Sequence, residues 1–443
     1  MKKVEILELL KDFIAIESVS TDPKRFPQIL KASEFLKKNL ESFGCDVKVF
    51  QIKDTPPLII GLYSMNKKAK TIGIYGHYDV QPEDPLLEWR SPPFKLTQKD
   101  GKLYARGVAD TKGHVIQNIV AIKNLIHHKK LHNNIIFIFE GGEEISSYGF
   151  EKYARNLQNI LSMVDVFYIV DLGMPATNEP TISFGLRGIV TFELEIKIGE
   201  VDLHSGTFGN RVLNPIHVIS YLISQMKNLR TNKVLIPRFY DNIKKPSKKE
   251  FTMLKKGILS VKEEMNKAHV FKIITIDDIP PSIVTKIMPS LDFNGVSSGY
   301  TGEGFKTVIG STAILKFSCR LVAEQTPSDI IQKITNFIKH SMPSGVIYNL
   351  NVESQASPVR IEIKNDYIQK AAKALAKVFR APTSYTMTGG SVPAAEILYR
   401  LYKKPMVMFG FPLPDSQIHA PNENVDEDMF WKGIKALEEV YQQ

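Results

Sequence analysis

The chain has 443 residues, of which 43% are hydrophobic and 23% are charged, and its net charge is +10 at neutral pH. This composition excludes a disordered or fibrous chain, and the length allows two domains or more. The basic balance would allow nucleic-acid binding, but the lysines are scattered rather than gathered into one stripe, so we expect no nucleic-acid partner.

The N-terminal segment MKKVEILELLKDFIAIESVS predicts an amphipathic helix rather than a signal peptide, because acidic residues interrupt its apolar spacing. No stretch of the sequence approaches the roughly 20 apolar residues of a membrane-spanning helix. The two cysteines, Cys45 and Cys319, have no spacing that indicates a disulfide, which is typical of buried thiols in a reducing compartment. We therefore expect a cytoplasmic protein with no membrane association.

Apolar, strand-like runs alternate with helix-like segments over the first 180 residues. Helical periodicity is present at 34–44, which ends at a glycine, and at 113–128. The strand-like runs are DVKVFQI, PLIIGLY, TIGIYGH, LYARGVA, NIIFIFE and VDVFYIV. Because most of these runs are apolar throughout, we expect an α/β domain in which a mixed sheet has helices on both faces.

A different pattern begins near Arg187. Apolar and polar residues alternate at 188–199, as in a strand with one solvated face. There follow a helix at 214–228, a strand at 311–322, a helix from Pro327 and a strand at 345–354, and then, after the insertion, helices at 365–379 and 427–441 around the strand PMVMFGF. We interpret 187–356 as an inserted α+β domain, and 1–186 with 357–443 as the domain that it interrupts.

Acidic residues and histidines follow five of the predicted strands. They are His77 and Asp79 after TIGIY, Asp110 after LYARGVA, Glu143 and Glu144 after NIIFIFEGG, Asp171 after VDVFYIV, and His419 in the loop after PMVMFGF. Because ligands of open α/β sheets bind beyond the carboxyl ends of the strands, we expect these side chains to converge. Carboxylates so close together would repel one another strongly unless divalent cations neutralised them.

Two histidines with several carboxylates form a ligand set that suits Zn²⁺, Mn²⁺ or Co²⁺. The set is larger than one open catalytic site needs, which indicates two cations with a bridging carboxylate and a spare carboxylate that serves as a base. Each residue alone has a structural interpretation, such as a capped loop at His77 or a solvated loop at Glu143 and Glu144. Their shared position at strand ends favours the metal site.

A series of segments resembles the M20 family of metallopeptidases, most closely its branch of cytosolic non-specific dipeptidases and carnosinases. The segments are GHYDVQPED, LYARGVADTKG, FEGGEEISSYG, ISFGLRGIVTFELEI with DLHSG, GYTGEGFKTVIGSTAILKFSCRLV, TGGSVPAAE and QIHAPNE. They span nearly the whole chain in order. The resemblance implies a zinc-peptidase-like catalytic, metal-binding domain with an inserted ferredoxin-like domain that forms a lid and a dimer interface.

The resemblance also implies two divalent cations in each subunit, with zinc as the expected metal and manganese or cobalt as alternatives. The implied ligands are His77 and Asp171 for one cation, Glu144 and His419 for the other, and Asp110 for both. A cis peptide bond is implied between Asp110 and Thr111.

Three further residues have implied catalytic roles. Asp79 would accept a hydrogen bond from His77 and fix its tautomer. Glu143 would be the general base that takes a proton from the attacking water. His204, in DLHSG, would reach the active site of the partner subunit in a homodimer and stabilise the oxyanion. The remaining histidines are expected to be structural: His114 lies next to Gly113 at the start of a predicted helix, and others, such as His217, have no motif around them.

Four residues have implied roles in substrate binding. Arg320 would hold the terminal carboxylate of the substrate by a bidentate contact. Gly389, Gly390 and Ser391 would bind the same end, because a glycine-rich loop allows close approach of the backbone. The structural alternatives are a salt bridge for Arg320 and a simple turn for the glycines.

We therefore expect an enzyme that hydrolyses the peptide bond of dipeptides with two metal ions and Glu143 as base. Three alternatives stay open: an N-acyl-amino-acid deacylase with the same metal site, a carboxypeptidase or aminopeptidase for longer peptides, and a basic binding protein without catalysis. The complete ligand set argues against the last alternative, because a binding protein has no need of a general base.

Overall fold

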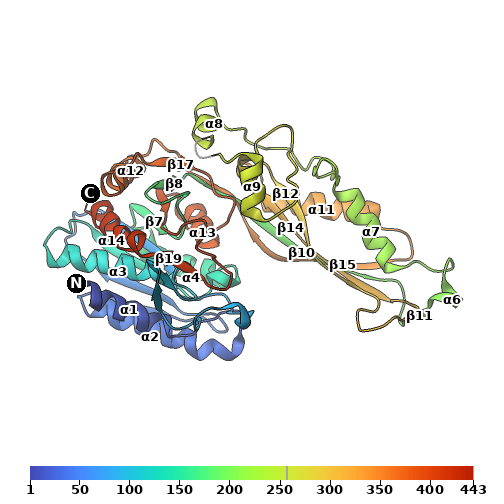
Figure 1. The fold of residues 1–443 in the computed structure, drawn as a ribbon, viewed down its shortest axis with the longest axis horizontal. Helices are drawn as coiled ribbons and strands as arrows, with labels where there is room; N and C mark the ends of the chain where they lie inside the picture. Colours follow the sequence, from blue (N-terminus) through green and yellow to red (C-terminus); the bar gives the residue numbers. More distant parts are fainter. Residues whose placement is uncertain (256–257, 443) are drawn as a thin grey trace. The chain divides into compact units, whose positions relative to one another are not determined.

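A computed structural model describes residues 1–255 and 258–442 of the chain, and these residues form two compact units (Figure 1). The first unit comprises Met1–Phe184, Ile361–Thr386 and Val392–Gln443. The second unit comprises Gly185–Arg360 and Met387–Ser391. The short segment Met387–Ser391, which the sequence analysis placed in the first domain, therefore groups with the second unit. None of the described helices has the length and the hydropathy that crossing a bilayer requires.

An eight-stranded mixed sheet forms the centre of the first unit, in the order β1-β2-β6-β3-β7-β18-β8-β17. Its strands are β1 (Asp46–Phe50), β2 (Leu58–Tyr63), β3 (Thr71–His77), β6 (Asn134–Glu140), β7 (Val166–Val170), β8 (Thr181–Ser183), β17 (Ser384–Thr386) and β18 (Met406–Phe409). The neighbours β6, β3, β7 and β18 run parallel, so their carboxyl ends lie along one edge of the sheet.

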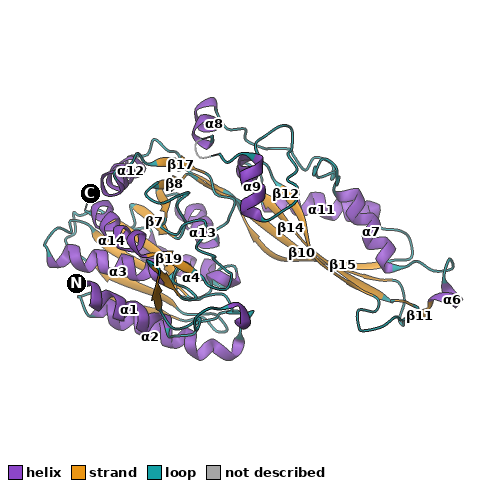
Figure 2. Ribbon diagram, viewed as in Figure 1, coloured by secondary structure: helices purple, strands orange, loops and turns teal. Residues whose placement is uncertain are grey.

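Helices cover both faces of this sheet (Figure 2). The helices of the unit are α1 (Lys3–Ile14), α2 (Phe26–Glu41), α3 (Lys112–His127), α4 (Phe150–Asn156), α5 (Gln158–Leu161), α12 (Asp366–Phe379), α13 (Pro393–Tyr402) and α14 (Glu427–Tyr441). Neighbouring residues of a strand point to opposite faces, and in β7 Phe167 packs against Tyr402 of α13 while Tyr168 packs against Tyr441 of α14. The predicted α/β sheet with helices on both faces is confirmed.

One predicted strand of the first unit is wrong. Of LYARGVA, only the start belongs to a strand, β5 (Lys102–Tyr104), which pairs with β4 (Thr97–Lys99) and β19 (Asn424–Asp426) in a separate small sheet. The chain then turns at Gly107, whose φ of 85° is a left-handed conformation that suits glycine. Asp110 therefore lies in the loop before α3, and not at the end of a strand of the main sheet.

The second unit contains a four-stranded antiparallel sheet in the order β12-β14-β10-β15. Its elements are, in chain order, β10 (Gly188–Lys197), α7 (Pro215–Met226), β12 (Ser290–Ser298), β14 (Thr312–Leu321), α11 (Pro327–Ser341) and β15 (Ile347–Ala356). This βαββαβ order is that of a ferredoxin-like domain, as predicted. Alternate residues of β10, from Val190 to Ile196, are buried in one core with residues of α7 and α11.

The sequence pattern missed β12, because its residues are mostly polar and only Leu291 is fully buried. A register shift between Phe293 and Gly295 also breaks the alternation on which strand prediction depends. The remaining described elements are short: η1 (Pro23–Arg25), η2 (Leu86–Glu88), η3 (Glu143–Ile145), β9 (Gly185–Leu186), β11 (Leu203–His204), α6 (Ser205–Phe208), α8 (Lys248–Leu254), α9 (Val261–Ala268), α10 (Pro281–Ile287), β13 (Val308–Ile309) and β16 (Val359–Arg360).

Candidate metal centre

Five side chains of the first unit lie in two groups that share one carboxylate. We call His77, Asp110 and Asp171 the inner group, and Asp110, Glu144 and His419 the outer group; within each, the candidate ligand atoms lie within 4.8 Å of one another. Nε2 of His77 is 3.0 Å from Oδ1 of Asp110, and Nε2 of His419 is 2.9 Å from Oδ2 of the same residue. The two oxygens of one carboxylate thus face the two histidines, as a bridging ligand requires.

The parallel strands of the sheet position four of these five residues. His77 ends β3, Asp171 directly follows β7, Glu144 lies in the turn η3 after β6, and His419 lies in the loop after β18. Asp110 comes from the loop before α3, and its peptide bond to Thr111 is cis, as the family resemblance implied. Strand ends that are neighbours in the sheet thus bring together residues that are far apart in the sequence.

The donor set fits divalent cations. Its histidine nitrogens and carboxylate oxygens are the ligands that zinc, manganese and cobalt accept. The Oε1 atom of Glu144 is buried and has no hydrogen-bond partner among the described residues, whereas its Oε2 accepts a hydrogen bond of 2.8 Å from Gln81. A buried carboxylate oxygen without a partner is costly, and a cation at the outer group would satisfy it.

The crowding of charged groups shifts the pKa values of the site. Burial, and behind it the charge of Asp110, raises the pKa of Asp171 to about 7 against the opposing effect of His77. Burial would lower the pKa of His77, but the surrounding carboxylates, Asp171 first, raise it well above its usual value. Hydrogen bonds that the His419 ring donates to the carboxylates of Asp110 and then Glu144 raise its pKa to about 10. Protons therefore compete with cations for this site.

Glu143 lies beside both groups and is not needed as a ligand of either. Burial raises the pKa of its carboxyl well above the usual value, and the charges of Asp171 and Glu144 add to this effect while that of His77 opposes it. A carboxylate whose pKa is raised accepts a proton more readily and can later donate the same proton. The position and the environment of Glu143 therefore agree with a general base.

Asp79 is buried and makes contacts at the carboxyl ends of two neighbouring strands, β3 and β6. Nδ1 of His77 lies 3.1 Å from the backbone oxygen of Asp79 and 3.3 Å from its carboxylate, so both groups orient the ring. The same carboxylate accepts hydrogen bonds from the backbone N–H groups of Glu143 and Glu144 at 3.2 and 3.0 Å, and from the Ser20 hydroxyl at 2.6 Å. Asp79 thus holds the turn that carries Glu143 and Glu144 in a fixed position relative to His77.

Glu423 is a residue that the sequence analysis missed. Its buried carboxylate accepts hydrogen bonds from the Arg106 guanidinium at 2.7 Å and from the backbone N–H groups of Gly107, Ala109 and Asp110 at 2.8 to 3.0 Å. These contacts fix the loop that carries Asp110. The only signal in the sequence was its place in the segment QIHAPNE, because the partners are more than 300 positions away.

His114 was expected to be structural, and its contacts lead to the inner group. Its Nε2 accepts a hydrogen bond of 3.2 Å from the backbone N–H of Phe411, so the proton of the neutral ring is on Nδ1, which lies 2.9 Å from Oγ1 of Thr111. The Thr111 hydroxyl in turn donates a hydrogen bond to Asp171. His114 thus helps to orient a predicted metal ligand through one intermediate side chain.

The predicted residues of the second unit form a separate set. Arg320 of β14 donates a hydrogen bond of 3.1 Å from Nη1 to the Ser391 hydroxyl, and Gly390, beside Gly389, accepts one at its backbone oxygen. His204 is exposed in β11, and its Nδ1 accepts a hydrogen bond from the backbone of the same loop. The structure therefore brings Arg320 and Ser391 together, and the roles of all four residues and of His204 stay predictions.

The family model of Peptidase family M20/M25/M40 matches residues 73–443. The chain belongs to this family. The resemblance seen in the sequence is confirmed, and the chain is a peptidase by family. The matched residues include both ligand groups and Glu143.

Curated relatives match along almost the whole chain. The Beta-Ala-His dipeptidase of Rattus norvegicus is 28% identical over 97% of this chain and 91% of its own length. The Cys-Gly metallodipeptidase DUG1 of Candida albicans is 29% identical over 98% and 93%. The solved structure of the M20 family metallo-carboxypeptidase Sso-CP2 from Sulfolobus solfataricus superposes with a TM-score of 0.90 at 27% identity, covering 100% of this chain and 99% of that chain.

Proposed function

We propose that this chain is a dipeptidase that uses two divalent cations at the inner and outer groups. The observation that carries the proposal is the Asp110 carboxylate, whose two oxygens face His77 and His419, with the buried Glu143 beside them. The names of two relatives, a Beta-Ala-His dipeptidase and a Cys-Gly metallodipeptidase, support hydrolysis of dipeptides. Zinc is the proposed metal, and manganese and cobalt accept the same ligands.

The residues of the chain divide the chemistry between them. When bound, two cations polarise the carbonyl of the scissile bond and lower the pKa of the attacking water. Glu143 would take a proton from that water and pass it to the leaving amine. Asp79 holds the turn of Glu143 and orients His77, so that base and ligands keep a fixed geometry. In a homodimer, His204 of the partner subunit would stabilise the oxyanion.

The substrate is proposed to be a short peptide with a free terminal carboxylate. Arg320 and the loop Gly389–Ser391 would hold that carboxylate, and the contact between Arg320 and Ser391 supports a shared role. The similarity to Sso-CP2 favours a second candidate, a carboxypeptidase that accepts longer peptides. An N-acyl-amino-acid deacylase would use the same metal ligands and the same terminal carboxylate.

A cytoplasmic location is part of the proposal. Cys45 and Cys319 are both buried free thiols, as is usual in a reducing compartment. No nucleic acid or membrane is among the proposed partners.

The decisive variant is Glu143→Ala. Because Glu143 would move the proton without binding a cation, we expect turnover of dipeptides to fall by roughly 100- to 10,000-fold while the metal content stays unchanged. The exposed Glu41→Gln, on α2, is the matched control and should change neither. Metal content is measured by mass spectrometry and turnover by release of the amino acid. Retention of most of the activity by Glu143→Ala would show that the base is another residue.

A substrate panel separates the three candidate reactions. Dipeptides, acetyl-amino acids and longer peptides are offered to the protein after loading with each metal. Preference for dipeptides supports the proposal. Hydrolysis of acetyl-amino acids alone would replace it with a deacylase, and equal hydrolysis of longer peptides would replace it with a carboxypeptidase.

A further inference from the structure

Two arginines of the second unit lie beside the same serine. Arg187, which directly precedes β10, donates from Nη2 to the backbone oxygen of Met288 at 3.0 Å and to the Ser290 hydroxyl at 3.2 Å. Ser290 is directly opposite Arg320 in the pairing of β12 with β14. Arg320 donates to the Ser391 hydroxyl at 3.1 Å. The charge of Arg320 also acts on the guanidinium group of Arg187, so the two groups lie near each other.

Neither arginine forms an ion pair within the part of the chain that the structure describes. The carboxylate whose charge acts on both, Asp292, is held by Lys227 at 2.8 Å. Arg187 is only 7% exposed, and its Nε has no hydrogen-bond partner among the described residues. Burial, followed by the charge of Arg320, lowers the pKa of Arg187 to about 10. Two positive charges that lie close together and are partly buried are unfavourable when no negative charge neutralises them. An anion bound beside these two arginines would remove that cost.

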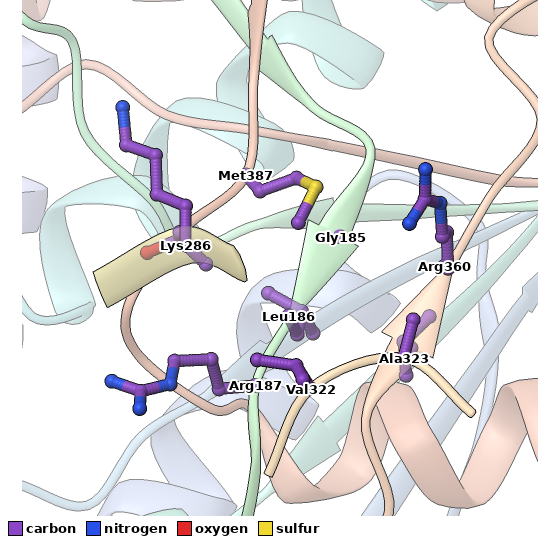
Figure 3. Close-up of a pocket in the computed structure, with 10 residues that line it drawn as sticks. Gly185, Leu186, Arg187, Lys286, Val322, Ala323, Arg360 and Met387 are labelled. Carbon is purple, nitrogen blue, oxygen red and sulfur yellow. The ribbon is translucent and has the colours of Figure 1, made fainter. Parts of the chain in front are cut away.

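The orientation of Arg187 separates it from a nearby arginine that is already paired. Figure 3 shows its guanidinium group extending away from Leu186 and Val322, while Arg360 lies on the other side of Leu186. Arg360 pairs with Glu250 at 2.6 Å. Arg187 and Arg360 line the same small pocket, with Lys286, and differ: Arg360 has a carboxylate partner within the unit, and Arg187 has none among the described residues.

The loop 387–391 brings small groups to the two arginines. The backbone N–H of Arg187 donates to the backbone oxygen of Gly390 at 3.0 Å, and the next residue, Ser391, contacts Arg320. A Cβ atom added at Gly389 would come no closer than 3.8 Å to any described neighbour, the nearest being Thr285. The loop is therefore not tightly packed at Gly389, two residues before the serine that Arg320 contacts.

We propose that Arg187 and Arg320 form a two-arginine anion site that holds the terminal carboxylate of the substrate, and that Arg187 is a specificity-determining residue. The identity of this ligand rests on the proposed function. A carboxylate accepts two parallel hydrogen bonds from each guanidinium edge that it faces, so Nε of Arg187 gains a partner. The carboxylate also removes the repulsion between the two arginines. A peptide whose terminal carboxylate is amidated lacks the charge and is rejected.

The test measures binding of N-acetyl-L-alanine, a carboxylate probe, by isothermal titration calorimetry, with N-acetyl-L-alanine amide as the uncharged comparison. Arg187→Gln is expected to weaken binding of the carboxylate by roughly 10- to 100-fold, because a hydrogen bond to a charged group is lost. Lys316→Gln is the matched control: Lys316 lies on β14 four positions before Arg320, is 62% exposed and pairs with Glu193, and its loss should leave binding unchanged. N-acetyl-L-alanine amide should show no measurable binding to the wild type or to either variant.

Equal affinity of the wild type and Arg187→Gln for the carboxylate would overturn the proposal. If Arg187→Gln does not fold, Arg187→Lys decides, because lysine keeps the charge but loses the planar fork; binding about tenfold weaker is expected, and unchanged binding overturns the proposal. The titrations are repeated in the Glu143→Ala background, so that hydrolysis of the acetyl group cannot be mistaken for binding. A wild type that hydrolyses no dipeptide but binds the probe through Arg187 would therefore refute the proposed reaction and leave the anion site standing.

Discussion

The inner and outer groups contain the same kinds of ligand but differ in their exposure to solvent. The side chain of His77 is completely buried and that of Asp171 is 8% exposed, whereas the side chain of His419 is 51% exposed. Charges interact more strongly where water is excluded, so an unneutralised inner group costs more and a bound cation stabilises it more. Two sites that share Asp110 are therefore expected to differ in affinity, with the inner cation held more tightly than the outer one.

Replacing Asp110, which both groups share, should remove the difference in cation affinity between the inner and outer groups. Asp110→Asn keeps the shape of the side chain but loses the charge that both groups use. We expect turnover to fall by more than the roughly 100- to 10,000-fold loss expected for a missing base, and both cations to be lost on dialysis. Metal analysis after dialysis checks this. Retention of one cation at its original affinity would show that Asp110 is not shared.

Replacing one residue that belongs to only one of the groups should reveal the difference in cation affinity between them. For His419→Ala we expect loss of the outer cation alone and recovery of activity in excess metal, because the site is open to solvent. For Asp171→Asn we expect loss of the tightly held cation and no recovery. Activity is titrated against added metal after chelation. Each affinity should fall by more than the roughly 10- to 100-fold that loss of a ligand's hydrogen-bond partner costs. Identical titrations for the two variants would contradict the comparison.

Glu423→Gln should weaken cation binding at both groups equally, and its effect should be smaller than that of the variants that remove a ligand. Glu423 holds the backbone at Asp110 and touches neither histidine, so the amide would weaken the loop without removing a ligand. We expect turnover to fall by about 10- to 100-fold and the free energy of unfolding to fall by about 1–3 kcal/mol. Metal-dependent kinetics and denaturant unfolding measure the two effects. A selective loss of the outer cation would mean that Glu423 acts through the His419 loop instead.

The pH dependence of cation binding needs no substitution and should report the proton on His419 of the outer group. In the cation-free protein the carboxylates raise the pKa of His419 from 6.5 to about 10, so the ring is protonated at neutral pH and this protonation stabilises the fold. That stabilisation is complete below pH 6.5 and is lost as the pH rises through about 10.

A cation that binds the outer group must displace this proton. Its affinity should therefore rise by about tenfold for each pH unit between about pH 7 and 10, which calorimetry in buffers of different protonation enthalpy can measure. His419→Ala is the control and should flatten the dependence. An affinity that is independent of pH in the wild type would show that His419 is neutral before the cation binds.

The sequence predicts most of the site because the strands that carry it are apolar throughout. The runs that became β3, β6, β7 and β18 could be identified from composition alone, and polar residues directly after them stood out. The sequence analysis placed Asp110 beside the other predicted ligands, as the structure does, but through the wrong element, because LYARGVA looks like a strand and turns at Gly107.

Other contacts of the site left no local pattern to find. Glu423 acts on backbone groups more than 300 positions away, and Ser20 contacts Asp79 from a distant segment. A single sequence shows side-chain types and spacing, but not which backbone N–H a distant carboxylate will reach. The same limit hid β12, whose polar residues and register shift remove the alternation that marks a strand.

The order of the ligands along the chain has a consequence for synthesis. His419 meets Asp110 across 309 positions, and the strand before it, β18, pairs with β7 in the middle of the sheet. A growing polypeptide that has not yet emerged from the ribosome as far as this loop lacks both a ligand and the clamp on Asp110. Hydrolysis at the proposed centre therefore requires that this loop has been synthesised and has folded against Asp110.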